Sequence, residues 1–311
     1  MKLLYPDILP APDTPYADIV IYDVTRPIPA EHEDAEALVA WGLSAELLRD
    51  AALRLGRLRW VQTLAAGPDS VLAAGFGPGV QITSGQSLHD ATVAEHALAL
   101  SLAAVRSLPE LLRAQIGHRW AQERGGTEQA DHGARLHTLR DARVLIWGFG
   151  GIARTLAPLL SGLGAEVRGI ARSPRIVDGY PVHAVGEIAG LLPDTDLLIM
   201  ILPSGERTNR VLSAELLAAL PAHAWLVNVG RGSTVDEDAL LSALRSGALA
   251  GAALDVTQIE PLPVDSALWD LPNVLITPHS AGGRPLGAEA LVAENLRLFT
   301  ENLPLRNRVA R

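Results

Sequence analysis

Short, almost continuously apolar segments recur along the chain from residue 143 onward. RVLIW (143–147), DLLIMIL (196–202) and AWLVNV (224–229) have few polar interruptions, which is typical of parallel strands covered on both faces. Amphipathic segments separate several of these segments, so the pattern predicts an α/β unit with a parallel sheet. The predicted strands are 143–147, 165–171, 196–202, 224–229, 251–256 and 273–277, and the predicted helices are 151–163, 213–220 and 236–246.

The first hundred residues carry a second, less regular alternation. Residues 17–23 (ADIVIYD) and 59–64 (RWVQTL) predict two strands, with an amphipathic helix over 44–57 between them. This order predicts a smaller α/β domain before the main one. Helices are also predicted over 91–107, ended by Pro109, and over 286–301.

Composition narrows the class of protein further. The 311 residues leave room for about two domains, and 48% hydrophobic content is enough for real cores. A net charge of -9 argues against a general nucleic-acid binder, and the absence of cysteine excludes disulfides and thiolate metal sites. No uncharged apolar stretch reaches the roughly 20 residues of a membrane span. We therefore expect a soluble, cytoplasmic protein that binds neither membrane nor nucleic acid.

A glycine-rich turn follows the strand predicted at 143–147. Gly148-Phe149-Gly150-Gly151-Ile152-Ala153 has the form G-x-G-x-x-A and opens the predicted helix, as in dinucleotide-binding βαβ units. Glycine at 148 and 150 lets the backbone approach a pyrophosphate at the positive end of the helix. The turn therefore predicts a bound dinucleotide.

The end of the next predicted strand indicates which dinucleotide is bound. NAD-specific chains carry an acidic residue there for the ribose 2′-hydroxyl, but this chain has Arg172, Ser173 and Arg175. Glu166 begins the strand, roughly 13 Å from its carboxyl end, and cannot take that role. Guanidinium groups suit a 2′-phosphate, so NADP(H) is the preferred cofactor, with NAD(H) possible if the arginines face solvent.

Three residues with complementary chemistry follow other strands of the same sheet. Arg231 follows the strand 224–229, Glu260 follows 251–256, and His279 follows 273–277. The carboxyl ends of parallel strands share one edge, where ligands of such sheets bind. Each residue taken singly could be an ordinary loop residue, but together they suit hydride transfer to a 2-keto acid.

The chemistry assigns each of the three a role. A guanidinium holds the substrate carboxylate and polarises the carbonyl, while an imidazolium delivers a proton to its oxygen. A neighbouring carboxylate orients the imidazole and favours its protonated form. The remaining histidines lack metal-ligand spacing such as H-E-x-x-H, so no metal is expected.

An ordered set of motifs resembles the D-isomer-specific 2-hydroxyacid dehydrogenase family, in particular its glyoxylate/hydroxypyruvate reductase branch. The resemblance covers nearly the whole chain. The motifs are Ala65-Ala66-Gly67, Thr92-Val93-Ala94-Glu95-His96, the Gly148 turn, Asn228-Val229-Gly230-Arg231-Gly232, Asp255 to Pro263, and Thr277-Pro278-His279-Ser280-Ala281-Gly282.

The resemblance implies two Rossmann-like or flavodoxin-like domains with parallel sheets and a cleft between them. Residues 1–97 and 282–311 would form a discontinuous substrate domain, and residues 98–281 an NAD(P)-binding Rossmann domain. It also implies a homodimer, with the helix over 91–107 near the subunit contact.

The resemblance also implies the site residues. The catalytic residues would be Arg231, Glu260 and His279. The substrate would be bound by Arg231 and His279 together with Ala65, Ala66 and Gly67, where Pro68 departs from the commoner pattern and removes one N–H donor. The cofactor would be bound by Thr92, Gly148, Gly150, Gly151, Ile152, Arg172, Ser173, Arg175, Pro203, Val229, Gly230, Asp255, Ser280 and Ala281.

The sequence thus predicts an NADPH-dependent reductase of small 2-keto acids, with glyoxylate or hydroxypyruvate as leading substrates. Oxidation of a formate- or phosphite-type substrate is a second enzymatic reading, but the extra substrate residues of formate enzymes are missing. An NAD(P)-binding regulatory or corepressor-like protein of the same fold is the alternative from another class. The size of the substrate's side chain is not fixed by the sequence.

Overall fold

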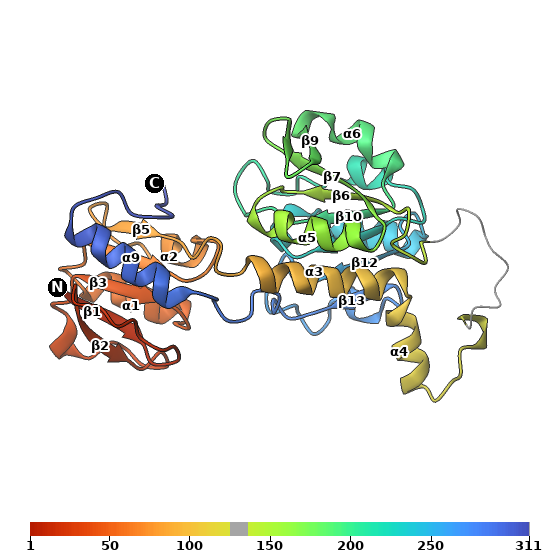
Figure 1. Ribbon diagram of the computed structural model, residues 1–311. Helices are drawn as coiled ribbons and strands as arrows, with labels where there is room; N and C mark the ends of the chain where they lie inside the picture. The colour runs from red at the N-terminus through yellow and green to blue at the C-terminus, as the bar shows by residue number, and fades with distance from the viewer. Residues whose placement is uncertain (125–135, 311) are drawn as a thin grey trace. The chain divides into compact units, whose positions relative to one another are not determined.

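The computed structural model describes residues 1–124 and 136–310, and the chain divides into two compact units (Figure 1). One unit comprises Met1–His89 with Arg284–Arg311, and the other comprises Asp90–Gly283. The expected boundary between residues 97 and 98 falls inside α3 (Asp90–Val105). That helix is continuous and packs along α5 (Gly151–Gly162), so the second unit begins at the start of the helix.

The first unit is built on a five-stranded, wholly parallel sheet. Its strand order is β2-β1-β3-β4-β5, the flavodoxin-like arrangement in which β2 lies on one side of β1 and the later strands are added on the other side. The strands are β1 (Lys2–Pro6), β2 (Asp18–Tyr22), β3 (Ala37–Ala40), β4 (Trp60–Thr63) and β5 (Gln81–Thr83), and the helices are α1 (Ala45–Arg54), α2 (Asp69–Ala73) and α9 (Ala288–Thr300).

Alternate residues of β3 show how this sheet is covered on both faces. Leu38 packs in the cluster that contains Leu48 of α1 and Val71 of α2, whereas Val39 packs in the cluster that contains Val292 of α9. All five side chains are almost completely buried. The carboxyl-terminal helix therefore completes the core of the amino-terminal sheet, and the unit depends on both ends of the chain.

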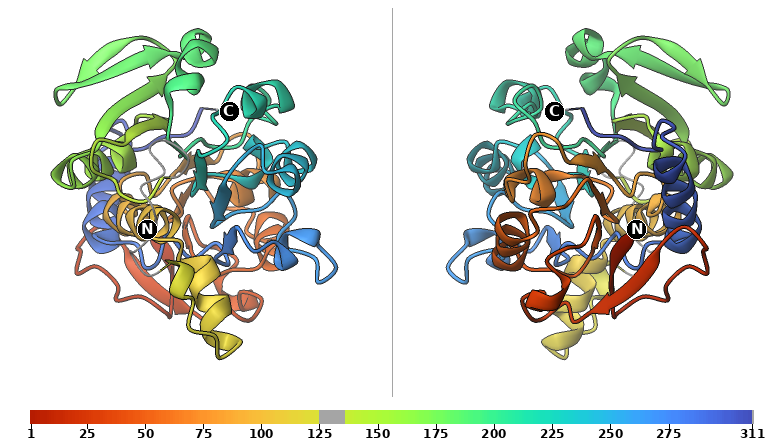
Figure 2. Two further views of the ribbon diagram at one scale, coloured as in Figure 1. Left: turned by 90° about the vertical axis from the view of Figure 1, so that its right-hand side faces the viewer. Right: turned by 90° about the vertical axis from the view of Figure 1, so that its left-hand side faces the viewer.

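The second unit contains an eight-stranded sheet with the order β13-β12-β11-β10-β6-β7-β9-β8. All neighbouring pairs are parallel except β8 with β9, a short hairpin at the margin of the sheet, coloured green in Figure 2. The strands are β6 (Arg143–Trp147), β7 (Glu166–Ala171), β8 (Arg175–Val177), β9 (Tyr180–Ala184), β10 (Leu197–Met200), β11 (Trp225–Asn228), β12 (Gly251–Leu254) and β13 (Val274–Ile276).

Two layers of helices cover this sheet. One face packs against α3 and α5, and the other packs against α6 (Ile188–Leu191), α7 (Ala214–Ala218) and α8 (Glu237–Ser246). The α/β class and the parallel sheets expected from the sequence are confirmed. In the described part of the chain, no helix is both long and apolar enough to cross a membrane.

Several short elements differ from the sequence expectations. β1, β3, β5 and the hairpin β8–β9 were not expected, because strands of three to five residues carry too little periodicity to stand out. Pro109 does not end the helix before it: α3 stops at Val105, and the proline lies in the first turn of α4 (Leu108–Ile116), where its missing N–H costs little.

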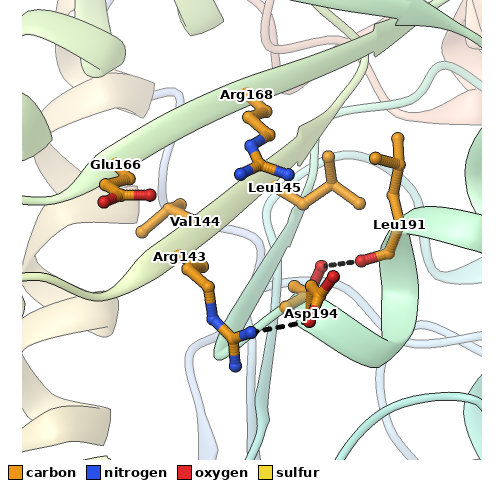
Figure 3. A pocket seen from close by; sticks show the side chains of 8 residues that line it. Arg143, Val144, Leu145, Glu166, Arg168, Leu191 and Asp194 are labelled. Carbon is orange, nitrogen blue, oxygen red and sulfur yellow. Dashed lines mark hydrogen bonds and ion pairs between the residues drawn. The ribbon is translucent and has the colours of Figure 1, made fainter.

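An ion-pair cluster fastens the amino-terminal edge of the larger sheet. Arg143 donates to both carboxylate oxygens of Asp196, at 3.1 and 2.8 Å, and to Asp194 at 2.8 Å, the pair drawn in Figure 3. His223 also donates to Asp196, at 2.8 Å. Burial alone would raise the pKa of Asp196, but the hydrogen bonds from Arg143 and His223 outweigh it and lower that pKa to about 2.

This cluster makes stability depend on pH in a defined window. A carboxyl group whose pKa is lower in the folded state stabilises the fold above its unfolded pKa, and that stabilisation is lost as the pH falls through the folded value. For Asp196 the loss falls between about pH 4 and pH 2, and a shift of this size corresponds to about 2 kcal/mol.

We therefore expect Asp196→Asn to lower the free energy of unfolding by about 2 kcal/mol at pH 7 and by much less at pH 2. Urea denaturation of both proteins across this range measures the difference. Asp265→Asn, at an exposed position, serves as the control and should not change the acid limb. A difference that is constant from pH 7 to pH 2 would show that Asp196 does not stabilise the fold through its charge.

Candidate active site

The carboxyl ends of the parallel strands in the second unit carry most of the predicted site residues. The glycine turn follows β6, Arg172 follows β7, and Arg231 lies just beyond β11. Asp255 follows β12 directly, and His279 follows β13. The sheet therefore presents these groups along one edge, as the sequence predicts.

The glycine turn has the features of a phosphate-binding turn. Gly148 adopts φ +105°, and a Cβ there would lie 2.7 Å from the carbonyl oxygen of Ile201. A Cβ at Gly150 would meet no atom within 4 Å, so open space lies above the turn. No side chain caps the amino terminus of α5, and Ala153 packs without exposure against the sheet. The Asp90 side chain lies close to Gly151, where a Cβ would collide with its carboxylate. The open space at Gly150 and the start of α5 fit the pyrophosphate of a dinucleotide.

The arginines expected to bind the 2′-phosphate lie beside this turn. Arg175, the first residue of β8, donates to the carbonyl oxygens of Ser173 at 3.3 Å and of Phe149 at 3.4 Å. Arg172 and Ser173 follow β7 directly and are exposed. Arg154 of α5 is a further cation that the sequence analysis did not select, but it donates to Asp178 at 2.7 Å. Arg175 is therefore the arginine that the structure ties to the glycine turn.

Arg231 lies in a loop held by its own hydrogen bonds. Asn228 accepts from the N–H of Gly230 at 3.0 Å and donates to the carbonyl oxygen of Arg231 at 3.1 Å. Thr234 donates to that same oxygen at 2.6 Å, and the Arg231 guanidinium donates to the carbonyl oxygen of Gly230 at 2.8 Å. The backbone at Arg231 is thus fixed from both sides.

Asp255 anchors the loop that carries His279. Its buried carboxylate accepts from the N–H groups of Ser280 at 2.9 Å and Ala281 at 3.0 Å, and from the hydroxyl of Thr277 at 2.6 Å. Its carbonyl oxygen accepts from the N–H of His279 at 2.8 Å. These bonds hold His279 at φ +51°, a conformation uncommon for a residue with a side chain.

His279 and Glu260 form the central pair of the site. Nδ1 of His279 lies 2.7 Å from a carboxylate oxygen of Glu260. Since a carboxylate only accepts, Nδ1 carries a proton, and Nε2 is left to face a substrate. The second oxygen of Glu260 accepts from the N–H of Thr257 at 3.1 Å, which fixes the carboxylate. Both side chains are partly exposed, at 47% and 37%, so a ligand can reach them.

A second histidine, His96, supports the same loop from α3. Nε2 of His96 lies 2.9 Å from the hydroxyl of Thr277 and 3.3 Å from Asp255. Because that hydroxyl already donates to Asp255, it accepts from His96. Thr92, one turn earlier, donates to the carbonyl oxygen of Gly282 at 2.6 Å. The start of α3 and the loop 277–282 are therefore joined by side-chain hydrogen bonds.

The first unit contains the loop expected to bind the substrate carboxylate. After β4, the N–H of Ala65 bonds to Thr63, and its carbonyl oxygen accepts from Gly85 at 2.8 Å. In the described residues, the N–H groups of Ala66 and Gly67 have no protein acceptor. Pro68 begins the turn into α2 and offers no N–H, so two adjacent donors are left for an anion.

The structure thus brings together some predicted residues and not others. Hydrogen bonds join His279 with Glu260, and Asp255 with Ser280 and Ala281. Among the described residues, the structure records no hydrogen bond or ion pair between Arg231 and either His279 or Glu260. Ile152, Pro203 and Val229 lie at the same sheet edge. His96, Thr257 and Thr277 were given no role of their own, although all three stand in motifs that the sequence analysis quoted. No cluster of possible metal ligands is found in residues 1–124 and 136–310.

Comparison with known proteins shows the family of the chain. The sequence model described as D-isomer specific 2-hydroxyacid dehydrogenase, NAD binding domain, matches residues 98–281. The chain belongs to the D-isomer specific 2-hydroxyacid dehydrogenase family. It is therefore an NAD(P)-dependent enzyme that acts on 2-hydroxy acids or the corresponding 2-keto acids.

The relatives include glyoxylate/hydroxypyruvate reductases. The chain is 32% identical to glyoxylate/hydroxypyruvate reductase A of Serratia proteamaculans over 277 residues, which cover 86% of this chain and 84% of that protein. It is 33% identical to glyoxylate/hydroxypyruvate reductase B of Pectobacterium carotovorum over 248 residues, 79% and 75% of the two chains.

Solved structures show the same two-domain fold. A D-isomer specific 2-hydroxyacid dehydrogenase from Xanthobacter autotrophicus, in complex with NADPH, matches with a TM-score of 0.80 at 30% identity over 99% of this chain and 97% of that one. An NADPH-dependent glyoxylate/hydroxypyruvate reductase from Sinorhizobium meliloti, in complex with NADP and sulfate, also gives 0.80, at 25% identity and the same coverage.

The hydrogen bonds to Asp255 predict that even a conservative substitution of this residue lowers the free energy of unfolding strongly. Asp255→Asn places an amide N–H₂ among donors that need an acceptor, and we expect it to lower the free energy of unfolding by about 3 kcal/mol. Chemical denaturation measures this loss. Asp238→Asn, with a side chain 94% exposed, is the matched control and should change stability by less than about 0.5 kcal/mol. Equal effects of the two variants would contradict the anchoring role of Asp255.

Proposed function

We propose that the protein reduces 2-keto acids to D-2-hydroxy acids, with His279 as the general acid and NADPH as the preferred cofactor. The observation that carries the proposal is the bond of 2.7 Å between His279 and Glu260, in a loop fixed by Asp255 at the cofactor edge of the sheet. When bound, the reduced nicotinamide supplies the hydride. The residues of the chain then bind the keto acid and supply the proton.

His279 delivers that proton through Nε2. Glu260 holds Nδ1 and stabilises the imidazolium, so the ring is oriented and charged before the carbonyl oxygen receives its proton. After the transfer His279 is neutral, and solvent restores its proton. Thr257 keeps the Glu260 carboxylate in place during this cycle.

The substrate carboxylate needs donors of its own. The N–H groups of Ala66 and Gly67 are suited to this role, and the Arg231 guanidinium supplies a positive charge to the keto acid and its developing oxyanion. In this proposal the first unit, Met1–His89 with Arg284–Arg311, is the substrate domain, and Asp90–Gly283 is the cofactor domain. Glyoxylate and hydroxypyruvate are the first substrates to test, since relatives bear these names.

We expect His279→Ala to lower kcat for keto-acid reduction by roughly 10²–10⁴-fold, the usual worth of a general acid. His183→Ala is a control, because His183 also bonds through Nδ1 to a glutamate, Glu187, but lies on β9, near the other end of the strand order from β13, which precedes His279. It should keep normal activity. Binding of NADPH, followed by tryptophan fluorescence, should survive both changes. Near-normal turnover of the His279 variant would exclude it as the proton donor, whereas a lack of turnover in the unaltered protein would favour a regulatory nucleotide-binding role.

The cofactor preference rests on the cations beside the glycine turn. Arg172 and Arg175 offer donors to a 2′-phosphate, and each charge-assisted hydrogen bond is worth roughly 1.5–3 kcal/mol. Among the described residues, Arg172 has no acidic partner that would compete with a phosphate. The structures of the Xanthobacter and Sinorhizobium proteins contain NADPH and NADP, which supports the same preference.

We therefore expect kcat/KM for NADPH to exceed that for NADH by at least about tenfold, since 1.4 kcal/mol is one decade. Arg172→Asp should reverse the preference, by repelling the phosphate and accepting from the ribose hydroxyl. Arg245→Asp, on the exposed last turn of α8, controls for the change of charge and should leave the ratio unaltered. Equal kcat/KM values for NADPH and NADH in the unaltered protein would show that both arginines face solvent and do not bind the 2′-phosphate.

We also propose that the protein is a homodimer that uses the exposed face of α4. Leu108, Leu112 and Ile116 follow one another at a spacing of four residues, and Ile116 is 80% exposed. Trp120, just beyond the helix, is 88% exposed. Arg113 fixes α4 to the second unit by donating to the carbonyl oxygens of Leu271 and Pro272. An apolar row on a firmly held helix fits burial against a second copy.

Ile116→Glu should then convert the dimer to a monomer at micromolar concentration, because the new charge would have to be buried. Sedimentation velocity separates the two species. Leu53→Glu changes an equally exposed leucine, 85% accessible on α1, and should leave the dimer intact. A monomer in the unaltered protein, or a dimer in the Ile116 variant, would contradict the use of this face.

A further inference from the structure

The first unit contains a cavity of about 160 Å³ beside the loop 65–67. It lies at the carboxyl ends of β3 and β4, between the starts of α1 and α2. Trp41 and Leu43 border it from the loop after β3, Leu48 from α1 and Val71 from α2. Ala65, the first residue of the loop expected to bind the substrate carboxylate, also lines it. A molecule held by Ala66 and Gly67 would therefore lie next to this cavity.

The walls of the cavity are held in place by groups outside it. The Trp41 ring lies against the ring of His89, with centroids 5.6 Å apart at 30°. His89 is buried, and its Nε2 bonds at 2.8 Å to the carbonyl oxygen of Leu64, the residue before the loop. Leu48 and Val71 belong to the core cluster of the sheet. The cavity is thus preformed on the same framework that fixes the loop.

The lining is uncharged. Of the described residues that border the cavity, none is Asp, Glu, Lys, Arg or His, and the side-chain polar groups are the hydroxyls of Thr63 and Ser70 and the indole N–H of Trp41. The Thr63 hydroxyl already accepts from the N–H of Ala65. A second carboxylate in this space would have no cation to pair with, whereas an alkyl group would gain from leaving water.

We propose that this cavity binds the side chain of the substrate, and that the substrate class is 2-keto acids with an unbranched or branched aliphatic side chain. This inference rests on the proposed function. A dry cavity of about 150 Å³ can hold a molecule the size of benzene, so a space of this size accepts side chains of roughly three to six carbons. Glyoxylate and pyruvate would leave most of it unfilled.

The test is a series of keto acids that differ by single methylene groups, from glyoxylate and pyruvate to 2-oxobutanoate, 2-oxopentanoate and 2-oxohexanoate. Each buried methylene should raise kcat/KM by roughly fourfold, the equivalent of about 0.8 kcal/mol. 2-Oxoglutarate is the matched substrate control, because it has the chain length of 2-oxopentanoate but ends in a carboxylate. It should be at least tenfold poorer than 2-oxopentanoate.

A variant that fills the cavity gives an independent readout. Ser70 is exposed on α2 and borders the cavity, so Ser70→Leu should fill it without removing a core side chain. The ratio of kcat/KM for 2-oxopentanoate to that for glyoxylate should fall by about tenfold or more. Ala73→Leu adds the same side chain to the same helix at an exposed position that does not border the cavity, and it should leave the ratio unchanged.

The possible outcomes distinguish a failure of the cavity inference from a failure of the proposed function. A rise along the series that Ser70→Leu abolishes supports the inference. Turnover that is highest with glyoxylate or hydroxypyruvate and falls with chain length would overturn it, while the proposed reduction of 2-keto acids would stand. A rise that survives in the Ser70 variant would place the side chain elsewhere and would also overturn it. Turnover of none of these acids would overturn both the inference and the proposed function.

Discussion

The carboxylate of Asp255 is the group on which the candidate active site depends. It lies at the end of a buried strand and accepts hydrogen bonds from two consecutive N–H groups and one hydroxyl of the loop after β13. A buried charge without such donors would lower the free energy of unfolding by several kcal/mol. The loop therefore cannot move away without removing the hydrogen-bond donors of the carboxylate. The same restraint keeps His279 in its left-handed conformation and within reach of Glu260. The His279 imidazole is thus positioned by the hydrogen bonds of its loop to Asp255 and by its own bond to Glu260.

In the proposed function, both units bind anions through backbone donors and obtain their selectivity from neighbouring side chains. The glycine turn after β6 and the N–H groups of Ala66 and Gly67 both use backbone donors, which bind anions without the reorganisation of long side chains. Selectivity comes from side chains placed beside these anchors. Arg175 stands next to the glycine turn, and Trp41 stands near the loop 65–67. General affinity for phosphate and carboxylate is therefore separate from the choice between related cofactors or related acids.

The sequence predicted the second unit better than the first. Strands such as β6 and β10 are nearly continuous apolar runs flanked by clear helices, so their pattern is unambiguous, and the family motifs follow them in order. β1 and β3 are as deeply buried, but they are short, and Pro6 or a run of acidic residues adjoins them. Their strand character comes from pairing with distant segments, which no local pattern records.

The same distinction applies to the site. The sequence analysis selected His279 and Glu260 because they follow strands of one sheet and stand in recognisable motifs. His96 was assigned only to a helix motif, because its bond to Thr277 joins residues far apart in the chain. The cavity beside Ala65 likewise is lined from four elements, β3, α1, β4 and α2 with their loops, which only the fold brings together. Motifs of adjacent residues can be recognised in a sequence, whereas hydrogen-bond partners that are distant in sequence cannot.

The Arg143–Asp196–His223 cluster occupies the edge of the larger sheet opposite to the glycine turn. The length of a strand, four residues in β10, separates the two edges by roughly 13 Å. Sites this far apart and without shared partners contribute to stability almost additively. The tolerance of the protein to acid and the chemistry of its active site are therefore separately adjustable. Evolution, or an engineer, could change the pH range in which the fold survives without retuning the enzyme.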